Sequence, residues 1–180
     1  MSLNTWKELL ASVPTTPEIL HSINSQHTWA CVYIDFAVDI HTGIVENILR
    51  IRAMRARILH DIEKTYGKAI AHIAGHDTSL QLYLPCPTTA TNLAFQILSS
   101  LGHHGKIAIG YDTGILLDSY KSMENLHAET LARFANHHEI AMTENCKQHI
   151  TIPDGIGCFP SSNPRSKQVG FPFWILKDYR

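Results

Sequence analysis

Long hydrophobic segments and blocks of like charge are both missing from this sequence. The 180 residues carry a formal net charge of −1, and no apolar run approaches the length of a membrane span. Residues 1–13 mix polar and charged residues with apolar ones, so we expect no secretory leader. Without a charged block, binding to nucleic acid or to an anionic membrane is not favoured. We therefore expect small ligands or protein partners, with no nucleic acid and no membrane.

Cysteine is also scarce, and its spacing does not suit zinc. The four cysteines are Cys31, Cys86, Cys146 and Cys158. Two of them lie within or beside apolar runs, where a thiol packs as a small hydrophobic group. This pattern predicts a reduced protein in the cytoplasm.

Histidine, by contrast, is abundant, with 12 residues in the chain. His103-His104 lies between glycines in a predicted turn, and His137-His138 follows a predicted helix end. This spacing does not build a dedicated histidine cage, so we expect both pairs to be solvated.

The length of the chain fits one globular domain with a substantial core. Residues 3–13 and 17–24 predict two short helices, so residues 1–26 are expected to form an N-terminal helical extension. Residues 27–180 are then expected to form a single domain, and no internal repeat is visible.

Within that domain, the hydrophobic periods predict an α+β fold. We expect helices at 43–66, 88–100, 123–134 and 145–150, and strands around 32–34 and at 68–75, 79–84, 106–110 and 139–143. Residues 151–168 predict an irregular loop, and residues 171–179 predict an edge strand because an edge tolerates Pro172. Hairpins mixed with crossovers predict a mostly antiparallel sheet with a ferredoxin-like (split βαβ) core and helices packed on it.

The stretch TWACVYIDFAVD, residues 28–39, is the most informative part of the sequence. It is apolar and rich in strand-forming residues, and Asp35 and Asp39 stand at its end. A carboxylate at the end of a buried strand is costly unless a cation meets it, so a metal ion or a basic partner is expected there. Two alternatives stay open. Either Asp35 or Asp39 is the first metal ligand, or one of the two carboxylates caps the next helix and the other is solvated.

Three separated stretches, in this order, resemble the catalytic domain of class III nucleotidyl cyclases, the adenylate and guanylate cyclase family. VYID, at 32–35, is similar to that family's strand ending in a metal-binding aspartate. HIAGHDTSLQLYLP, at 72–85, resembles its hairpin with a Gly-Asp tip. KIAIGYDTG, followed by HAETLARFAN and EIAMT, resembles its glycine-bearing strand, its Asn-x-x-x-Arg helix and the strand after it. The similarity spans residues 29–143.

This resemblance implies a head-to-tail homodimer that converts a nucleoside triphosphate into a cyclic nucleotide and pyrophosphate. Each shared site would hold two Mg²⁺ or Mn²⁺ ions. Asp35 and Asp77 match the metal-binding aspartates, and Arg133 matches the arginine that stabilises the transition state.

The remaining site positions depart from the family's pattern. Glu129 stands where the family has asparagine, His72 stands near the position of the base-reading lysine, and Phe36 is expected beside the substrate. The hairpin tip is one residue longer, with His76 between the glycine and the aspartate. Which base is read is therefore left open.

Three other hypotheses remain. A degenerate cyclase-homology domain would bind a nucleotide, or pair with another cyclase-like chain, without turnover. A palm-like core of the diguanylate cyclase type is disfavoured because the chain lacks the Gly-Gly-Asp/Glu-Glu-Phe signature. In an unrelated α+β domain, Arg133 would be a surface residue paired with Glu129 at the i, i+4 spacing.

Overall fold

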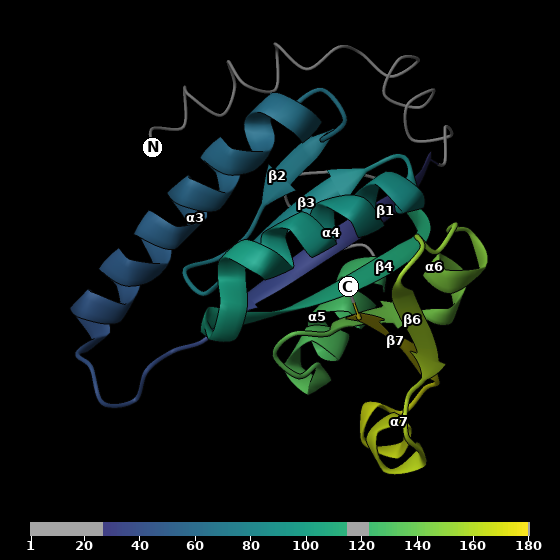
Figure 1. Cartoon of the computed structure of the whole chain (residues 1–180). Coiled ribbons are helices and arrows are strands. Elements are labelled where there is room, and N and C mark those ends of the chain that lie inside the picture. Colours follow the sequence, from purple (N-terminus) through teal and green to yellow (C-terminus); the bar gives the residue numbers. More distant parts are fainter. Residues whose placement is uncertain (1–26, 115–122, 180) are drawn as a thin grey trace, which may run out of the picture.

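A seven-stranded sheet with helices on both faces forms the body of the molecule (Figure 1). The computed structural model describes residues 27–114 and 123–179, so the two helices expected before residue 27 lie outside the described residues. The strand order is β2-β3-β1-β4-β5-β7-β6. The elements are β1 (His27–Phe36), α3 (Ile44–Tyr66), β2 (His72–Ala74), β3 (Ser79–Leu84), α4 (Pro87–Leu101), η1 (Gly102–His104), β4 (Gly105–Gly114), α5 (Met123–Phe134), β5 (Ile140–Thr143), α6 (Glu144–Gln148), β6 (Ile156–Pro160), α7 (Asn163–Val169) and β7 (Phe173–Asp178).

The expected α+β fold with a mostly antiparallel sheet is confirmed. β1 pairs antiparallel with β3 and β4, β2 with β3, and β7 with β5 and β6. β4 and β5 form the parallel pair within the described residues, and α5 connects them. No helix of the described residues is long and apolar enough to cross a membrane.

The side chains of β1 alternate between two hydrophobic layers. Val32 and Ile34 face α3 and α4, and join the larger cluster of buried residues. Cys31 and Tyr33 face the other way, into a smaller cluster with the buried side of α5. Asp35 follows in the second series, so β1 presents this carboxylate on the α5 side of the sheet.

The long helix α3 packs only part of its length against the core. Ile51, Ile58 and Ile62 are buried as the sequence period predicts, but Ile44 at the first position is 80% exposed. Figure 1 shows this end of α3 projecting past the sheet. Gly67 ends the helix, as expected.

Three arginines of α3 tie the helix to neighbouring backbone. Arg50 donates to the carbonyl of Ala37, Arg55 to that of His76, and Arg57 to that of Ser100. These bonds attach α3 to the β1–α3 loop, the β2–β3 turn and the end of α4.

The structure corrects two expectations near the C-terminus. Residues 151–168 are not an irregular loop, because they contain β6 and α7, and β7 is not an edge strand, because it lies between β5 and β6. The helix signals were present in the sequence: Ser162 is the N-cap residue, a proline stands in the first turn, and Gly170 ends α7 in the left-handed region at φ 90°.

Candidate functional site

Asp35 lies at the carboxyl end of β1, between two neighbouring strands. Its partner across β3 is Ser79, and its partner across β4 is Lys106. The side chain is partly buried, and this burial raises the pKa of the Asp35 carboxyl, while the positive charges of Arg133 and Lys106 act in the opposite direction. Asp35 therefore has two basic side chains of the same chain within electrostatic range.

Helix α5 supplies the other charged groups at this edge of the sheet. Ala128, Leu131 and Ala132 are fully buried against the strands, which leaves Glu129 and Arg133 on the rim of the helix. A guanidinium nitrogen of Arg133 lies 2.7 Å from a carboxylate oxygen of Glu129, and the two side chains are 66% and 17% exposed, respectively. Most of the Arg133 side chain is thus accessible to a ligand, although one end is already paired.

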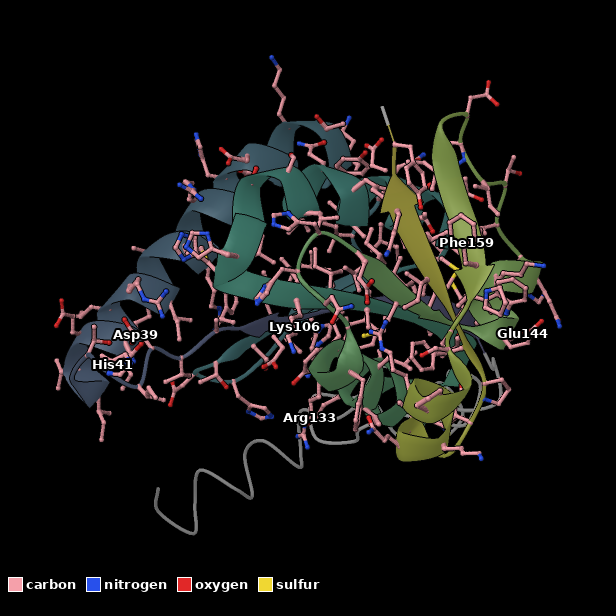
Figure 2. The ribbon with its side chains drawn as sticks, turned by 60° about the horizontal axis from the view of Figure 1, so that its bottom comes forward. Asp39, His41, Lys106, Arg133, Glu144 and Phe159 are labelled. Carbon is pink, nitrogen blue, oxygen red and sulfur yellow. The ribbon has the colours of Figure 1, made fainter. Side chains whose placement is uncertain are left out.

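Lys106 joins the helix to the strand. Its ammonium donates to the backbone carbonyl of Arg133 over 3.2 Å. Figure 2 shows both side chains in the same part of the molecule, at the end of α5 beside the start of β4. Asp35, Lys106, Glu129 and Arg133 therefore form one charged group, which we call the α5 edge site.

Tyr33 and Ser79 lie beneath the α5 edge site. Tyr33 is 5% exposed, and burial raises the pKa of its phenol, while a hydrogen bond from the Ser79 hydroxyl lowers it. The Ser79 oxygen in turn accepts the backbone N–H of His76 over 3.1 Å. This pair of hydrogen bonds links β1 to the turn between β2 and β3.

The sequence patterns do not single out Lys106, Tyr33 or Ser79 as site residues. Tyr33 stands two positions before Asp35, and side chains on a strand share a face at that spacing, so the sequence did contain a signal for it. Lys106 and Ser79 depend on the pairing register, which the sequence does not reveal.

The second predicted metal ligand, Asp77, lies in the β2–β3 turn. In this turn Gly75 has a φ of 144°, and the side chain of Asp77, two residues before Ser79, is exposed. Because Ser79 is paired with Asp35, the turn and the end of β1 lie at the same edge of the sheet. The role of Asp77 as a metal ligand stays a prediction.

The two predicted substrate-binding residues lie in different surroundings. The His72 ring, on β2, is centred 5.8 Å from the ring of Tyr83 and is partly exposed. The Phe36 side chain is 3% exposed and belongs to the large cluster on the opposite side of the sheet. Their roles in base binding stay predictions.

Asp39 does not join the α5 edge site. Its carboxylate accepts the backbone N–H of His41 over 2.9 Å, and its own N–H donates to Asn47 over 3.0 Å. Figure 2 shows Asp39 and His41 beside the start of α3, well separated from Lys106 and Arg133. Asp39 therefore stabilises the loop before α3, whose N-cap residue is Gly43.

The described residues offer few ligands for a metal ion. They contain no group of three or more His, Cys, Asp or Glu side chains arranged to hold one. Asp35 fits a cation in one respect, because a partly buried carboxylate with a raised pKa gains from a positive neighbour. A pair of divalent ions would need Asp77 as a second carboxylate and backbone or ligand oxygens besides.

The fold is shared with solved nucleotidyl cyclase domains. The guanylate cyclase domain of RhGC from Catenaria anguillulae, solved in complex with GTP, has a TM-score of 0.65 and 11% identity over 86% of this chain and 98% of that one. The guanylyl cyclase domain of the RhoGC fusion protein from the aquatic fungus Blastocladiella emersonii has a TM-score of 0.66 and 10% identity over 86% and 97%. An adenylate cyclase from Trypanosoma brucei has a TM-score of 0.57 and 12% identity over 91% and 89%.

At these identities the likeness concerns the fold. No protein-family model matches the sequence, and no curated protein matches it. The predicted resemblance to class III nucleotidyl cyclase catalytic domains is thus confirmed for the architecture of the chain. The chemistry of its site has to be argued from its own residues.

Proposed function

We propose that this chain is a divergent nucleotidyl cyclase, which converts a nucleoside triphosphate into a cyclic nucleotide and pyrophosphate. The observation that carries the proposal is the α5 edge site on a cyclase fold. There, a partly buried aspartate at the end of β1 lies within electrostatic range of a lysine and of a largely exposed arginine. Two of the solved domains with this fold were crystallised with GTP or ATPαS, which supports a nucleoside triphosphate as the substrate class.

In this proposal Asp35 and Asp77 hold divalent cations, Mg²⁺ or Mn²⁺. Bound cations would activate the ribose 3′-hydroxyl and neutralise the charge that develops on the phosphates. The guanidinium of Arg133 donates to phosphate oxygens, because its exposed side chain can turn from Glu129 toward a ligand. Lys106 adds a second fixed positive charge beside the same phosphates.

The remaining assignments extend the same proposal. His72 contacts the base, while Phe36, buried on the other side of the sheet, contributes by anchoring the end of β1 in the core. Two copies of the chain pair head to tail, so that each site is completed by residues of both. The reduced thiols of the chain agree with a cytoplasmic setting, since all four cysteines are free.

The experiment incubates the purified chain with Mn²⁺ and each of the four common nucleoside triphosphates, and product is identified by mass spectrometry. We expect a cyclic nucleotide from at least one of them and none from Asp35→Asn. Asp39→Asn is the matched control, because Asp39 is the nearby aspartate that only stabilises a loop, and it should retain activity. Cyclic product at the wild-type rate from Asp35→Asn would overturn the assignment, and no product from any triphosphate would overturn cyclase activity of the homomeric chain.

A second candidate function is favoured by the ion pair between Glu129 and Arg133. Glu129 partly neutralises the arginine, and its negative charge would repel a triphosphate. A domain with this pair could bind a nucleotide, or pair with another cyclase-like chain, without turning it over. Glu129→Asn separates the two candidates: it should accelerate an active cyclase by freeing Arg133, whereas a degenerate domain would bind nucleotide more tightly and still form no cyclic product.

A further inference from the structure

Lys106 lies between the two parts of the α5 edge site, the end of β1 with Asp35 and the end of α5 with Arg133. It is the cross-strand partner of Asp35, and side chains at directly opposed positions of antiparallel strands lie on the same face with Cβ atoms about 5 Å apart. Its ammonium also donates to the carbonyl of Arg133, at 3.2 Å. One flexible side chain thus connects the strand that carries the aspartate to the helix that carries the arginine.

The carbonyl that Lys106 binds belongs to the last turn of α5. The last four carbonyls of a helix lack partners within the helix and carry the negative end of its dipole, so a cation there is favourable. Arg165, on α7, donates a hydrogen bond to the next carbonyl, that of Phe134. The end of α5 is therefore held by two cationic side chains, and only Lys106 also faces Asp35.

We infer that Lys106 is a positioning residue of this site. Its ammonium fixes the last turn of α5, and with it Arg133, beside the end of β1, and its charge balances that of Asp35 until a divalent cation binds. The inference rests on the proposed function for the second of these roles, since that role assumes a cation at Asp35. The first role depends only on the hydrogen bond to the helix end.

Two consequences of opposite sign follow from removing the ammonium. Without Lys106 the last turn of α5 opens more often, so Arg133 is less well placed and a nucleotide should bind more weakly. A bare cation should bind more tightly, because one positive charge near Asp35 is gone. A residue with a merely structural role would weaken both.

The test compares Lys106→Met with Lys106→Arg and with Arg57→Met. Methionine keeps the length and apolar stem but removes both the charge and the donor, while arginine keeps both. Arg57→Met is the matched control: Arg57 also donates to a carbonyl in the last turn of a helix, that of Ser100 in α4, but it lies on the opposite side of the sheet. Binding of Mn²⁺ is measured by electron paramagnetic resonance, GTP binding by calorimetry with Mn²⁺ present, and helix opening by hydrogen exchange.

For Lys106→Met we expect faster exchange at the end of α5, where the Ala135 amide donates to Leu131. We also expect Mn²⁺ binding without nucleotide to strengthen about two- to fivefold, as suits a partly solvated charge pair, and GTP binding to weaken. Lys106→Arg should remain within about twofold of the wild type in all three measurements. Arg57→Met should change exchange at the end of α4 only.

Unchanged exchange at the end of α5 in Lys106→Met would overturn the positioning role. Weaker Mn²⁺ binding in that variant would overturn the charge-balancing role. If the wild-type chain binds no Mn²⁺ at all, the proposed function fails and the charge-balancing role fails with it, while hydrogen exchange still decides whether Lys106 holds the helix.

Discussion

Replacing Arg165 by methionine is expected to destabilise the protein, because the change leaves the buried carboxylate of Glu139 without its nearest cation. Glu139 is 2% exposed and lies 2.6 Å from Arg165, whose side chain is 25% exposed. A second oxygen of Glu139 lies 3.8 Å from Lys177, and the backbone N–H of Asn136 donates to the carboxylate over 2.8 Å. This network joins the segment between α5 and β5 to α7 and β7.

The magnitude follows from how much compensation remains. Breaking a fully buried ion pair by removing one partner costs about 3–5 kcal/mol. Lys177 and the Asn136 N–H stay in place here, and Arg165 is partly solvated, so we expect a loss of about 2–3 kcal/mol in the free energy of unfolding. In a chain of this length that corresponds to a fall of about 4–12 °C in Tm.

Urea unfolding followed by circular dichroism measures the loss directly, and thermal unfolding checks it. The double variant Arg165→Met, Glu139→Leu removes both charges and should recover at least about 1 kcal/mol of the loss, because no carboxylate is then stranded in the interior. A loss below about 0.5 kcal/mol for Arg165→Met would refute the reasoning, since that is the behaviour of a solvent-screened surface pair.

Three further predictions concern the turn, the acidic site and the thiols. Gly75→Ala should cost about 1–3 kcal/mol in urea unfolding, because φ is 144° and a Cβ would collide with a facing backbone carbonyl. Gly43→Ala, with open space around it, should cost less than about 1 kcal/mol, because only the N-cap preference for glycine over alanine is lost. Asp35→Asn should stabilise the metal-free protein at neutral pH. Burial raises the pKa of Asp35, so the wild-type protein loses stability as the pH rises from the ordinary pKa of aspartate to the raised pKa of Asp35. The stability difference between Asp35→Asn and the wild type should therefore vanish at pH values below that range. A stability difference that grows toward acid pH would contradict the assignment. Iodoacetamide should modify the exposed Cys86 first, because hydrogen bonds from Thr89 lower the pKa of its thiol. It should spare Cys146, because burial raises the pKa of that thiol to about 12. Early labelling of Cys146, detected by mass spectrometry, would contradict its burial.

Much of the fold was predictable because it depends on local periods. The 3.6-residue pattern gave α3, α4 and α5 with bounds close to those observed, and the apolar run before Asp35 gave β1. The exposed hairpin tip at Asp77 followed from its turn residues. In these helices and in β1 the apolar period indicates which face is buried, although at Ile44 the end of α3 extends past the core.

The C-terminal part was predicted less well. The Pro, Gly, Ser and Asn content of residues 151–168 favoured a loop, but the pairing of β6 with β7 and the caps of α7 order this segment. β7 lies inside the sheet, between β5 and β6. The neighbours of a strand depend on long-range pairing, so the sequence of residues 173–178 does not show that both edges of β7 are hydrogen-bonded.

The candidate site, too, was predictable only in part. The sequence by itself determined that an aspartate ends a buried strand and that Glu129 and Arg133 share one side of a helix. Only the tertiary structure decided that Lys106 faces Asp35 and holds the end of α5, and that Asp39 belongs to a loop instead. The physical reason is that the hydrophobic periodicity of a segment determines on which face each side chain lies, whereas the neighbours of that side chain across a sheet depend on a register set by the whole chain.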